Sequence, residues 1–373
     1  MERSLIGILG ASGKVGQLVC DYLVRNTGYI VKAGYRKTIP FLFNGRLRWQ
    51  FVDIQDKQKL FEFCRDCKII INCIGSSRNI NLNLAFMAHE VGAIYIDTYG
   101  TGKLKKELVN RDIVNSGCYI LGAGVYPGLT GIAMNYLVKK YPSIKKWKGM
   151  AGSYEPIGAG AAEDLLYSCL YGFGIENAYW KHGQIKVPKR KEIEEIYIPQ
   201  LQKTKNIALF LPDEILQIAK ENDLETIRWY NILPNKEHMA IMKKAYQKLL
   251  QRNDIATEIQ EFEEITRKST EHWNIISFNS DDAEVGQILV KLEISNTSAY
   301  KMTGIVAALL AIRSAQTKRK AEFGTHMRLF RCNMYLKNCK KRCVHKGNAG
   351  SFCCLRRKRR NRYTVKDNSC TKI

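Results

Sequence analysis

The chain has 373 residues, with 59 Lys and Arg against 35 Asp and Glu, and a net charge of +24. Its 45% hydrophobic and 25% charged residues are typical of a globular protein and exclude a low-complexity chain. The length favours two domains. No apolar run approaches the roughly 20 residues that cross a bilayer, and no secretory signal precedes the first apolar segment. We therefore expect a cytoplasmic protein.

The positive charge is concentrated at the end of the chain. Residues 317–373 contain eighteen Lys and Arg but two acidic residues, whereas the rest has 41 basic and 33 acidic residues. The same segment holds six of the twelve cysteines. Scattered cysteines in the rest are typical of reduced cytosolic thiols. Residues 317–373 are thus a different kind of sequence, which we expect to be disordered or non-native.

Strand-like and helix-like segments alternate over residues 1–130. Apolar strands are expected at 4–12, 29–37, 47–55, 68–75, 93–100 and 118–129, and helices at 14–26, 57–64, 81–92 and 105–117. Strands that are apolar on both faces indicate a parallel sheet covered by helices on both sides. With right-handed crossovers this α/β pattern predicts a doubly wound sheet.

The pattern changes after Leu129. A helix at 130–141 is expected to lead into a second, α+β domain over 131–294, which would serve the substrate or dimerisation. Its segments include strands at 147–155, 207–212 and 288–296 and helices at 160–172 and 213–222. The strand at 288–296 is expected at the edge or outer part of its sheet. An apolar helix within 295–316 is long enough to return to the first domain.

A glycine-rich turn joins the first expected strand to the first helix. It reads Gly10-Ala11-Ser12-Gly13-Lys14-Val15-Gly16. Gly10 permits the tight turn, Gly13 lets the backbone approach a diphosphate, and Gly16 allows close packing of helix on strand. The free N–H groups of the helix N-terminus then face the phosphates. This context predicts a Rossmann domain that binds a dinucleotide.

The end of the second strand indicates which dinucleotide is bound. An acid there would bind the ribose 2′-hydroxyl of NAD, but this chain has Arg36-Lys37 and no acid. Because arginine grips phosphate with two hydrogen bonds, we expect NADP rather than NAD. Further contacts are expected where strands end: the adenine at Asp53-Ile54, and the ribose and diphosphate at Cys73-Ile74-Gly75.

These motifs together resemble the saccharopine dehydrogenase-like reductases. The resemblance rests on GASGKVG, GYR, FVDIQD, IINCIGS, HEVGAIYIDTYG and GAGVYPGL, and covers about residues 4–316. It implies a two-domain, often dimeric enzyme that uses NAD(P), typically to reduce an imine. A subgroup reduces carrier-bound double bonds in secondary metabolism. The family's Asp-Thr pair is Asp97-Thr98 here, and we count Thr98 and Gly124 among the coenzyme contacts.

Catalytic candidates lie in the loops at the carboxyl ends of the strands, at 76–81, 97–102 and 122–129. Tyr99 and Tyr126 are candidate proton donors, or they pack beside the nicotinamide. Asp97 either orients a substrate amine or binds its own loop. In the second domain the candidates for substrate contact are Tyr154, Glu155, Lys181 and His182.

The leading hypothesis is an NADP-dependent reductase of an imine in a small or carrier-bound substrate. One alternative is a trans-acting reductase of carrier-bound C=C bonds. Another is an NADP-sensing regulator whose basic tail binds nucleic acid. The tail departs from the family, and a frame change near Lys318, a cloning junction and a genuine basic arm at Arg356–Arg362 all remain open. Its cysteines fit no standard zinc spacing, so we expect no metal.

Overall fold

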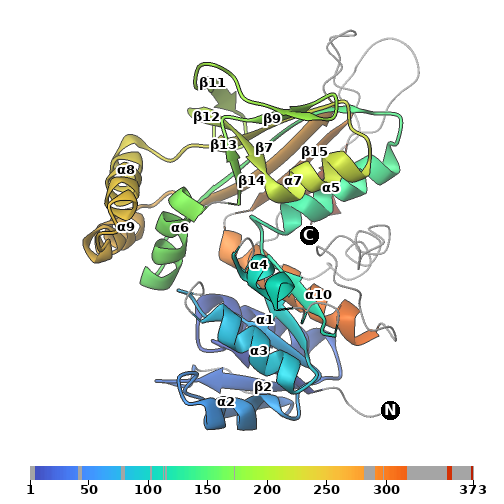
Figure 1. Cartoon of the computed structure of the whole chain (residues 1–373), viewed down its shortest axis with the longest axis vertical. Helices are drawn as coiled ribbons and strands as arrows, with labels where there is room; N and C mark the ends of the chain where they lie inside the picture. Colours follow the sequence, from blue (N-terminus) through green and yellow to red (C-terminus); the bar gives the residue numbers. More distant parts are fainter. Residues whose placement is uncertain are drawn as a thin grey trace.

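The computed structural model describes residues 5–40, 44–76, 80–100, 103–111, 113, 116–171, 173–280, 290–296, 298–316, 351–354 and 371–372. They form two units that are stacked along the long axis of the molecule (Figure 1). Each unit is built on its own β-sheet.

The first unit contains a six-stranded sheet in the order β3-β2-β1-β4-β5-β6. All neighbouring strands are parallel. The strands are β1 (Leu5–Leu9), β2 (Ile30–Tyr35), β3 (Leu47–Phe51), β4 (Ile69–Asn72), β5 (Ile94–Asp97) and β6 (Tyr119–Leu121). The connecting helices are α1 (Lys14–Asn26), α2 (Lys57–Cys64), α3 (Asn81–Glu90) and α4 (Lys103–Asn110). This strand order confirms the expected doubly wound Rossmann sheet.

Alternating side chains of the central strands supply a core on each face of the sheet. Ile6 and Ile8 lie in one buried cluster with α1 and α10 (Ala299–Gln316). Leu9 and Ile70 lie in the other, with α2, α3 and α4. Because neighbouring residues of a strand point to opposite faces, both faces need apolar residues, as the sequence pattern indicates.

Helix α10 follows β15 (Lys291–Asn296) in the chain but packs along α1. The contact is close at Gly304, where a methyl group would come within 2.8 Å of the Leu18 Cβ. Val306 and Leu310 of the same helix are buried in the core beside α1. The first unit is therefore completed by a helix that follows most of the second unit in the chain.

The second unit begins with α5 (Leu129–Lys140) and holds a larger, mixed sheet. Its main path runs β10-β9-β13-β7-β14-β15-β16-β17, while β12 pairs with β13, β11 and β8. The strands are β7 (Lys146–Tyr154), β8 (Gly174–Glu176), β9 (Tyr179–Lys181), β10 (Gln184–Lys186), β11 (Ile193–Ile198), β12 (Lys203–Pro212), β13 (Thr226–Ile232), β14 (Trp273–Ser280), β15 (Lys291–Asn296), β16 (Ser351–Cys354) and β17 (Thr371–Lys372). Trp147, Trp229 and Phe278 form its core with α5 and α7 (Asp213–Glu221).

Three further helices, α6 (Ala159–Tyr171), α8 (Lys236–Leu250) and α9 (Ala256–Lys268), pack together beside this sheet (Figure 1). Leu166, Leu249 and Phe262 belong to their shared core. The start of α6 contacts the first unit, since the Ser76 N–H donates to the Gly160 carbonyl at 3.3 Å. The second unit thus lies against the carboxyl end of β4, where a Rossmann sheet binds its ligand.

One expectation for the second sheet needs correction. The segment at 288–296 is expected at the edge or in the outer part of its sheet; β15 starts at Lys291 and is not the edge strand, because it lies between β14 and β16 in the outer part of the sheet. The neighbour β16 comes from the basic tail, which the local pattern could not relate to β15. Apart from β16 and β17, residues 317–373 lie outside the described part of the chain, Arg356–Arg362 included. Within the described ranges, no helix combines the length and apolarity needed to span a bilayer.

A buried polar pair joins the carboxyl ends of β4 and β5. The Asn72 Nδ2 donates to Asp97 Oδ2 at 3.1 Å, and the Tyr95 hydroxyl donates to the same oxygen at 2.7 Å. Asp97 Oδ1 accepts the backbone N–H groups of Tyr99 and Gly100. Asn72 and Asp97 are 1% and 0% exposed, so these bonds have no competition from water. The pair fixes the shape of both loops.

We expect Asn72→Ala to destabilise the protein strongly. The change removes one donor from Asp97 and leaves the Ile74 N–H without the Asn72 Oδ1 that accepts it at 3.1 Å. Each buried group left unpaired costs roughly 1–3 kcal/mol. Urea denaturation measures the loss, with the exposed Asn206→Ala as control, for which we expect a change within about 0.5 kcal/mol. Equal stability of the two variants would contradict the role of this pair.

Candidate active site

The glycine-rich turn is held tightly between three strands. Gly10 has a φ of +77°, and a Cβ there would lie 2.9 Å from the backbone carbonyl of Cys73. The Ala11 N–H donates to the Gly34 carbonyl at 3.1 Å, at the end of β2. A side chain at position 10 would force β1 and β4 apart. The turn therefore needs glycine there, as the sequence predicted.

Helix α1 starts directly against this turn. A Cβ on Gly16 would lie 2.2 Å from the Gly10 carbonyl oxygen. Gly13 is the N-cap, no side chain caps the helix, and its first turn contains no acid. Gly13 and Lys14 are exposed, Ser12 and Val15 partly so. The Gly13 N–H donates to the Gly10 carbonyl at 3.0 Å within the turn. The other N–H groups at this helix end lie at the carboxyl edge of the sheet, which suits a diphosphate.

The other predicted coenzyme contacts follow the ends of neighbouring strands. Asp53 folds into a local turn, accepting the Gln55 N–H at 3.0 Å, and Ile54 packs against the core of the α2 face. Burial raises the pKa of the Cys73 thiol well above its usual range, so this cysteine is a poor nucleophile. Gly75 lies against Gly160 of α6. Residues 77–79 and 101–102 of the predicted loops lie outside the described residues.

Thr98 and Gly124 lie side by side beyond β5 and β6. The Thr98 N–H and hydroxyl both donate to the Asn72 carbonyl, at 3.2 and 3.1 Å. A Cβ on Gly124 would lie 2.8 Å from the Thr98 carbonyl oxygen. Asp97 directly precedes Thr98, and both of its carboxylate oxygens accept hydrogen bonds from β4, β5 and its own loop. This geometry favours the loop-binding interpretation of Asp97 over contact with a substrate amine.

The two candidate tyrosines tie the units together. The Tyr99 hydroxyl donates to the Asp164 carbonyl of α6 at 2.8 Å, and its ring meets Phe173 edge-on. The Tyr126 hydroxyl donates to the Gly152 carbonyl at 2.8 Å and also contacts Asn274. Burial, together with Glu155, raises the pKa of Tyr126 well above its usual range. Both geometries favour packing over proton donation, and a catalytic role stays a prediction.

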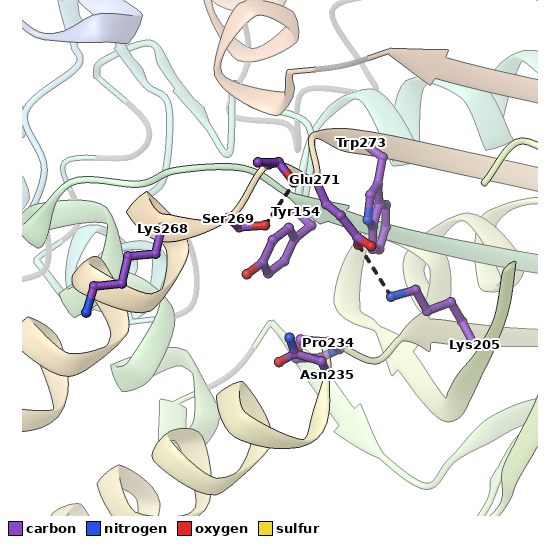
Figure 2. A pocket seen from close by; sticks show the side chains of 9 residues that line it. Tyr154, Lys205, Pro234, Asn235, Lys268, Ser269, Glu271 and Trp273 are labelled. Carbon is purple, nitrogen blue, oxygen red and sulfur yellow. Dashed lines mark hydrogen bonds and ion pairs between the residues drawn. The ribbon is translucent and has the colours of Figure 1, made fainter. Parts of the chain in front are cut away.

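The structure separates Tyr154 from Glu155, which follows it at the end of β7. Figure 2 shows the Tyr154 ring reaching into a pocket of about 290 Å³ beside Pro234 and Asn235. Its hydroxyl lies 2.9 Å from the His238 Nε2. Glu155 instead lines a second cavity. This division follows from the alternation of side chains along a strand.

The second cavity, of about 190 Å³, lies where the two units meet. It is lined by Lys14, Glu155, Pro156, His272, Ser298, Tyr300 and Lys301. Lys14 comes from the glycine-rich turn, and its ammonium group donates to the Pro156 carbonyl at 3.3 Å. The same group lies 5.4 Å from the centre of the Tyr300 ring. We call this space the interface cavity.

Lys181 and His182 lie at the β9–β10 turn, and both are exposed. His182 has a φ of +47°, and its Nε2 is 3.9 Å from a Glu225 carboxylate oxygen. Neither residue lines the interface cavity. Of the second-unit candidates, the structure thus brings Glu155 to the glycine-rich turn. No group of residues in the described ranges could hold a metal ion.

Comparison with known proteins identifies the first unit. Residues 6–111 match the family model described as the saccharopine dehydrogenase NADP binding domain. Residues 6–111 are a saccharopine dehydrogenase NADP-binding domain. The chain therefore contains a saccharopine dehydrogenase-like coenzyme domain, and it is an NADP-dependent oxidoreductase. The predicted coenzyme is confirmed, and the predicted family is confirmed for residues 6–111.

Solved structures show how far the similarity extends. The apo histidine-tagged saccharopine dehydrogenase (L-Glu forming) from Saccharomyces cerevisiae is 12% identical, with a TM-score of 0.58, over 94% of this chain and 100% of that chain. This likeness shows a common fold across both units. A short-chain dehydrogenase/reductase from Veillonella parvula in complex with NADP is 15% identical over 32% of this chain and 67% of that chain, with a TM-score of 0.25. No curated protein matches the chain.

The residues of this saccharopine dehydrogenase-like chain fit NADP at two places. At the glycine-rich turn, Gly13 is exposed and has no side chain, so a diphosphate can approach its backbone. Arg36 and Lys37 directly follow β2 and are exposed, and neither forms an ion pair with a described residue. Because the Ala11 N–H is bonded to the end of β2, these two cations lie beside the turn. They are well placed to bind the 2′-phosphate that distinguishes NADP.

Sequence reasoning missed two buried residues that shape the site. Asn72 ends the apolar strand IIIN. A polar residue at the carboxyl end of a buried strand indicates a hydrogen-bonding role near the site, and this signal could have identified it. Glu214 of α7 accepts the Gly128 N–H at 3.0 Å and also bonds Thr130, so it holds the loop after β6. Nothing in the local sequence relates Glu214 to a loop 86 residues earlier.

We expect Gly16→Ala to weaken NADPH binding. The new methyl group would clash with the Gly10 carbonyl and push α1 away from the turn. Overpacking of this kind costs about 1–3 kcal/mol, which corresponds to roughly a 5- to 150-fold change in an equilibrium constant. Isothermal titration calorimetry measures the affinity, and circular dichroism confirms folding.

The control is Gly28→Ala, since a Cβ on Gly28 meets nothing within 4 Å. We expect its affinity for NADPH to equal that of the wild type. If Gly16→Ala also bound NADPH with wild-type affinity, the turn would not be the diphosphate site.

Proposed function

We propose that this chain uses NADPH to reduce the C=N bond of an imine in a small or carrier-bound substrate. The observation that carries the proposal is the interface cavity, which brings the coenzyme turn of one unit to a carboxyl group of the other. Its lining includes one acid with two lysines and a histidine, so it suits a polar group that changes charge. The fold shared with a saccharopine dehydrogenase along the whole chain supports the same reaction class.

Each part of the site has a distinct task in this proposal. NADPH supplies the hydride when it is bound. Backbone amides of residues 12–15 other than that of Gly13, which donates to the Gly10 carbonyl, bind its diphosphate. Arg36 and Lys37 bind its 2′-phosphate. The loops after β4, β5 and β6 orient the substrate, and α6 of the second unit limits access of water to the site.

Oxidation of NADPH by defined substrate mixtures tests this function. One arm offers 2-oxo acids together with amino acids or other primary amines, which form imines in solution. A second arm offers enoyl thioesters, which carry a C=C bond. We expect oxidation when a carbonyl compound and an amine are both present, and none with either alone. Turnover of the thioesters instead would favour the C=C reductase, and binding without any turnover would favour a regulator.

The family resemblance also leads us to propose that the protein acts as a homodimer in the cytoplasm. Light scattering on the purified full chain tests the oligomeric state. A monomer at all concentrations would contradict the proposal.

The coenzyme preference should depend on Arg36. We expect Arg36→Glu to lower NADPH affinity and to leave NADH affinity nearly unchanged, because NADH has no 2′-phosphate. Loss of a hydrogen bond to a charged group costs about 1.5–3 kcal/mol, or roughly a 10- to 150-fold change in Kd. Calorimetric titration with both coenzymes measures the ratio.

Arg190→Glu is the matched control, since Arg190 is an exposed arginine of the second unit. It makes the same change in net charge without touching the coenzyme site. An equal loss of NADPH affinity in both variants would show a general charge effect and contradict a 2′-phosphate contact at Arg36.

A further inference from the structure

Reduction of an imine consumes a hydride and a proton, and the proton needs a source. The hydroxyl groups of Tyr99 and Tyr126 already donate to main-chain carbonyls. Asp97 is fully buried, and its two oxygens accept four hydrogen bonds. None of these three is poised to give a proton to a substrate. A different acid is needed beside the coenzyme.

Glu155 has an uncommitted carboxyl oxygen. The residue is 7% exposed, and its Oε1 accepts the Tyr300 N–H at 2.9 Å. Its Oε2 has no hydrogen-bond partner among the described residues. A buried carboxylate with an unpaired oxygen is costly, whereas the protonated form is tolerated. Burial raises the pKa of Glu155, although hydrogen bonds from Ser298, Tyr300 and Ala299 at the start of α10 oppose the rise. The group therefore retains its proton to a higher pH than an ordinary glutamate.

Two contacts place Glu155 between the ends of the coenzyme site. The interface cavity also contains Lys14 of the glycine-rich turn, where the diphosphate is expected. One helical turn beyond Tyr300, the Thr303 Cγ2 lies 3.6 Å from the position of a Cβ on Gly124, in the loop after β6. The nicotinamide half of a dinucleotide extends between these two points of a Rossmann sheet. A coenzyme bound in this way would have its reacting part beside Glu155.

We propose that Glu155 is the acid that supplies the proton to the substrate nitrogen, a role that rests on the proposed imine reduction. The imine carbon takes the hydride from NADPH and forms the new C–H bond. The C=N π electrons move to nitrogen, which takes the proton from the Glu155 carboxyl. The products are the amine, NADP⁺ and the Glu155 carboxylate, which recovers a proton from water.

The charges around Glu155 predict how it gains this proton. Lys14, Lys301 and His272 line the same cavity, and Tyr126 lies close enough for Glu155 to raise its pKa. The positive charge of Lys14 favours the Glu155 carboxylate in the free protein. A bound diphosphate neutralises that charge and adds negative charge nearby. NADPH binding should therefore be accompanied by proton uptake at Glu155.

Calorimetric titration of NADPH in buffers of different ionisation enthalpy measures this uptake directly. We expect the wild type to take up a fraction of one proton per site at some pH between about 5 and 9. Glu155→Gln should bind NADPH with little or no uptake, because its amide still accepts the Tyr300 N–H but cannot titrate. Glu155→Asp retains an acid and should retain the uptake. Glu194→Gln, an acid of β11 outside the cavity, should behave as the wild type.

The outcomes separate this proposal from the proposed function. No NADPH binding by the folded wild type would contradict the coenzyme site itself. Binding without uptake at any pH, or equal uptake in Glu155→Gln, would overturn the role of Glu155. Should Glu155→Gln fail to fold, Lys14→Met tests the same coupling, since uptake must fall once there is no cation for the diphosphate to neutralise.

Turnover gives a second readout with any imine that the substrate screen identifies. Glu155→Gln should lower kcat on the order of 10²- to 10⁴-fold, the usual contribution of a positioned acid. The wild-type rate should fall as the pH rises past the pKa of Glu155, because the acid is then lost. This pH dependence should be absent in Glu155→Gln. An unchanged rate and pH profile would overturn the proposal.

Discussion

The structure depends on the close backbone contact at Gly10. A Cβ there would meet the Cys73 carbonyl at 2.9 Å, so only glycine lets β1 turn beside β4 at this point. The bond from the Ala11 N–H to the Gly34 carbonyl ties the same turn to β2. These constraints place the N-terminus of α1 at the carboxyl ends of the strands. They also place Arg36 beside the glycine-rich turn. The proposed diphosphate site and the proposed 2′-phosphate contact of Arg36 both depend on this one turn.

The second unit completes the site by lying over the same edge. Hydrogen bonds from Ser76 to Gly160 and from Tyr99 to Asp164 bind the loops of the first unit to α6. Tyr126 makes the corresponding contact with β7. The tyrosines that looked like proton donors are thus used to hold the two units together. We propose that the proton for the reaction comes instead from Glu155, which lines the interface cavity.

The sequence was a good guide to the first unit because its signals are local. The signals are the apolar strands, the glycine spacing, and the presence of Arg36 where an NAD-binding protein has an acidic residue. Each involves residues close together in the chain. The candidate site was harder to predict, because the partner of the Tyr99 hydroxyl lies 65 residues away. The alternation of side chains along a strand predicts that Tyr154 and Glu155 point in opposite directions. It does not predict which of the two lies near Lys14. Those choices depend on how two sheets pack against each other.

A crystal structure of the full chain with NADPH tests the central claim most directly. The account predicts the diphosphate over the backbone amides of residues 12–15, the 2′-phosphate within hydrogen-bond distance of Arg36 or Lys37, and the nicotinamide beside Glu155. Coenzyme bound elsewhere, or with its 2′-phosphate away from both cations, would contradict it.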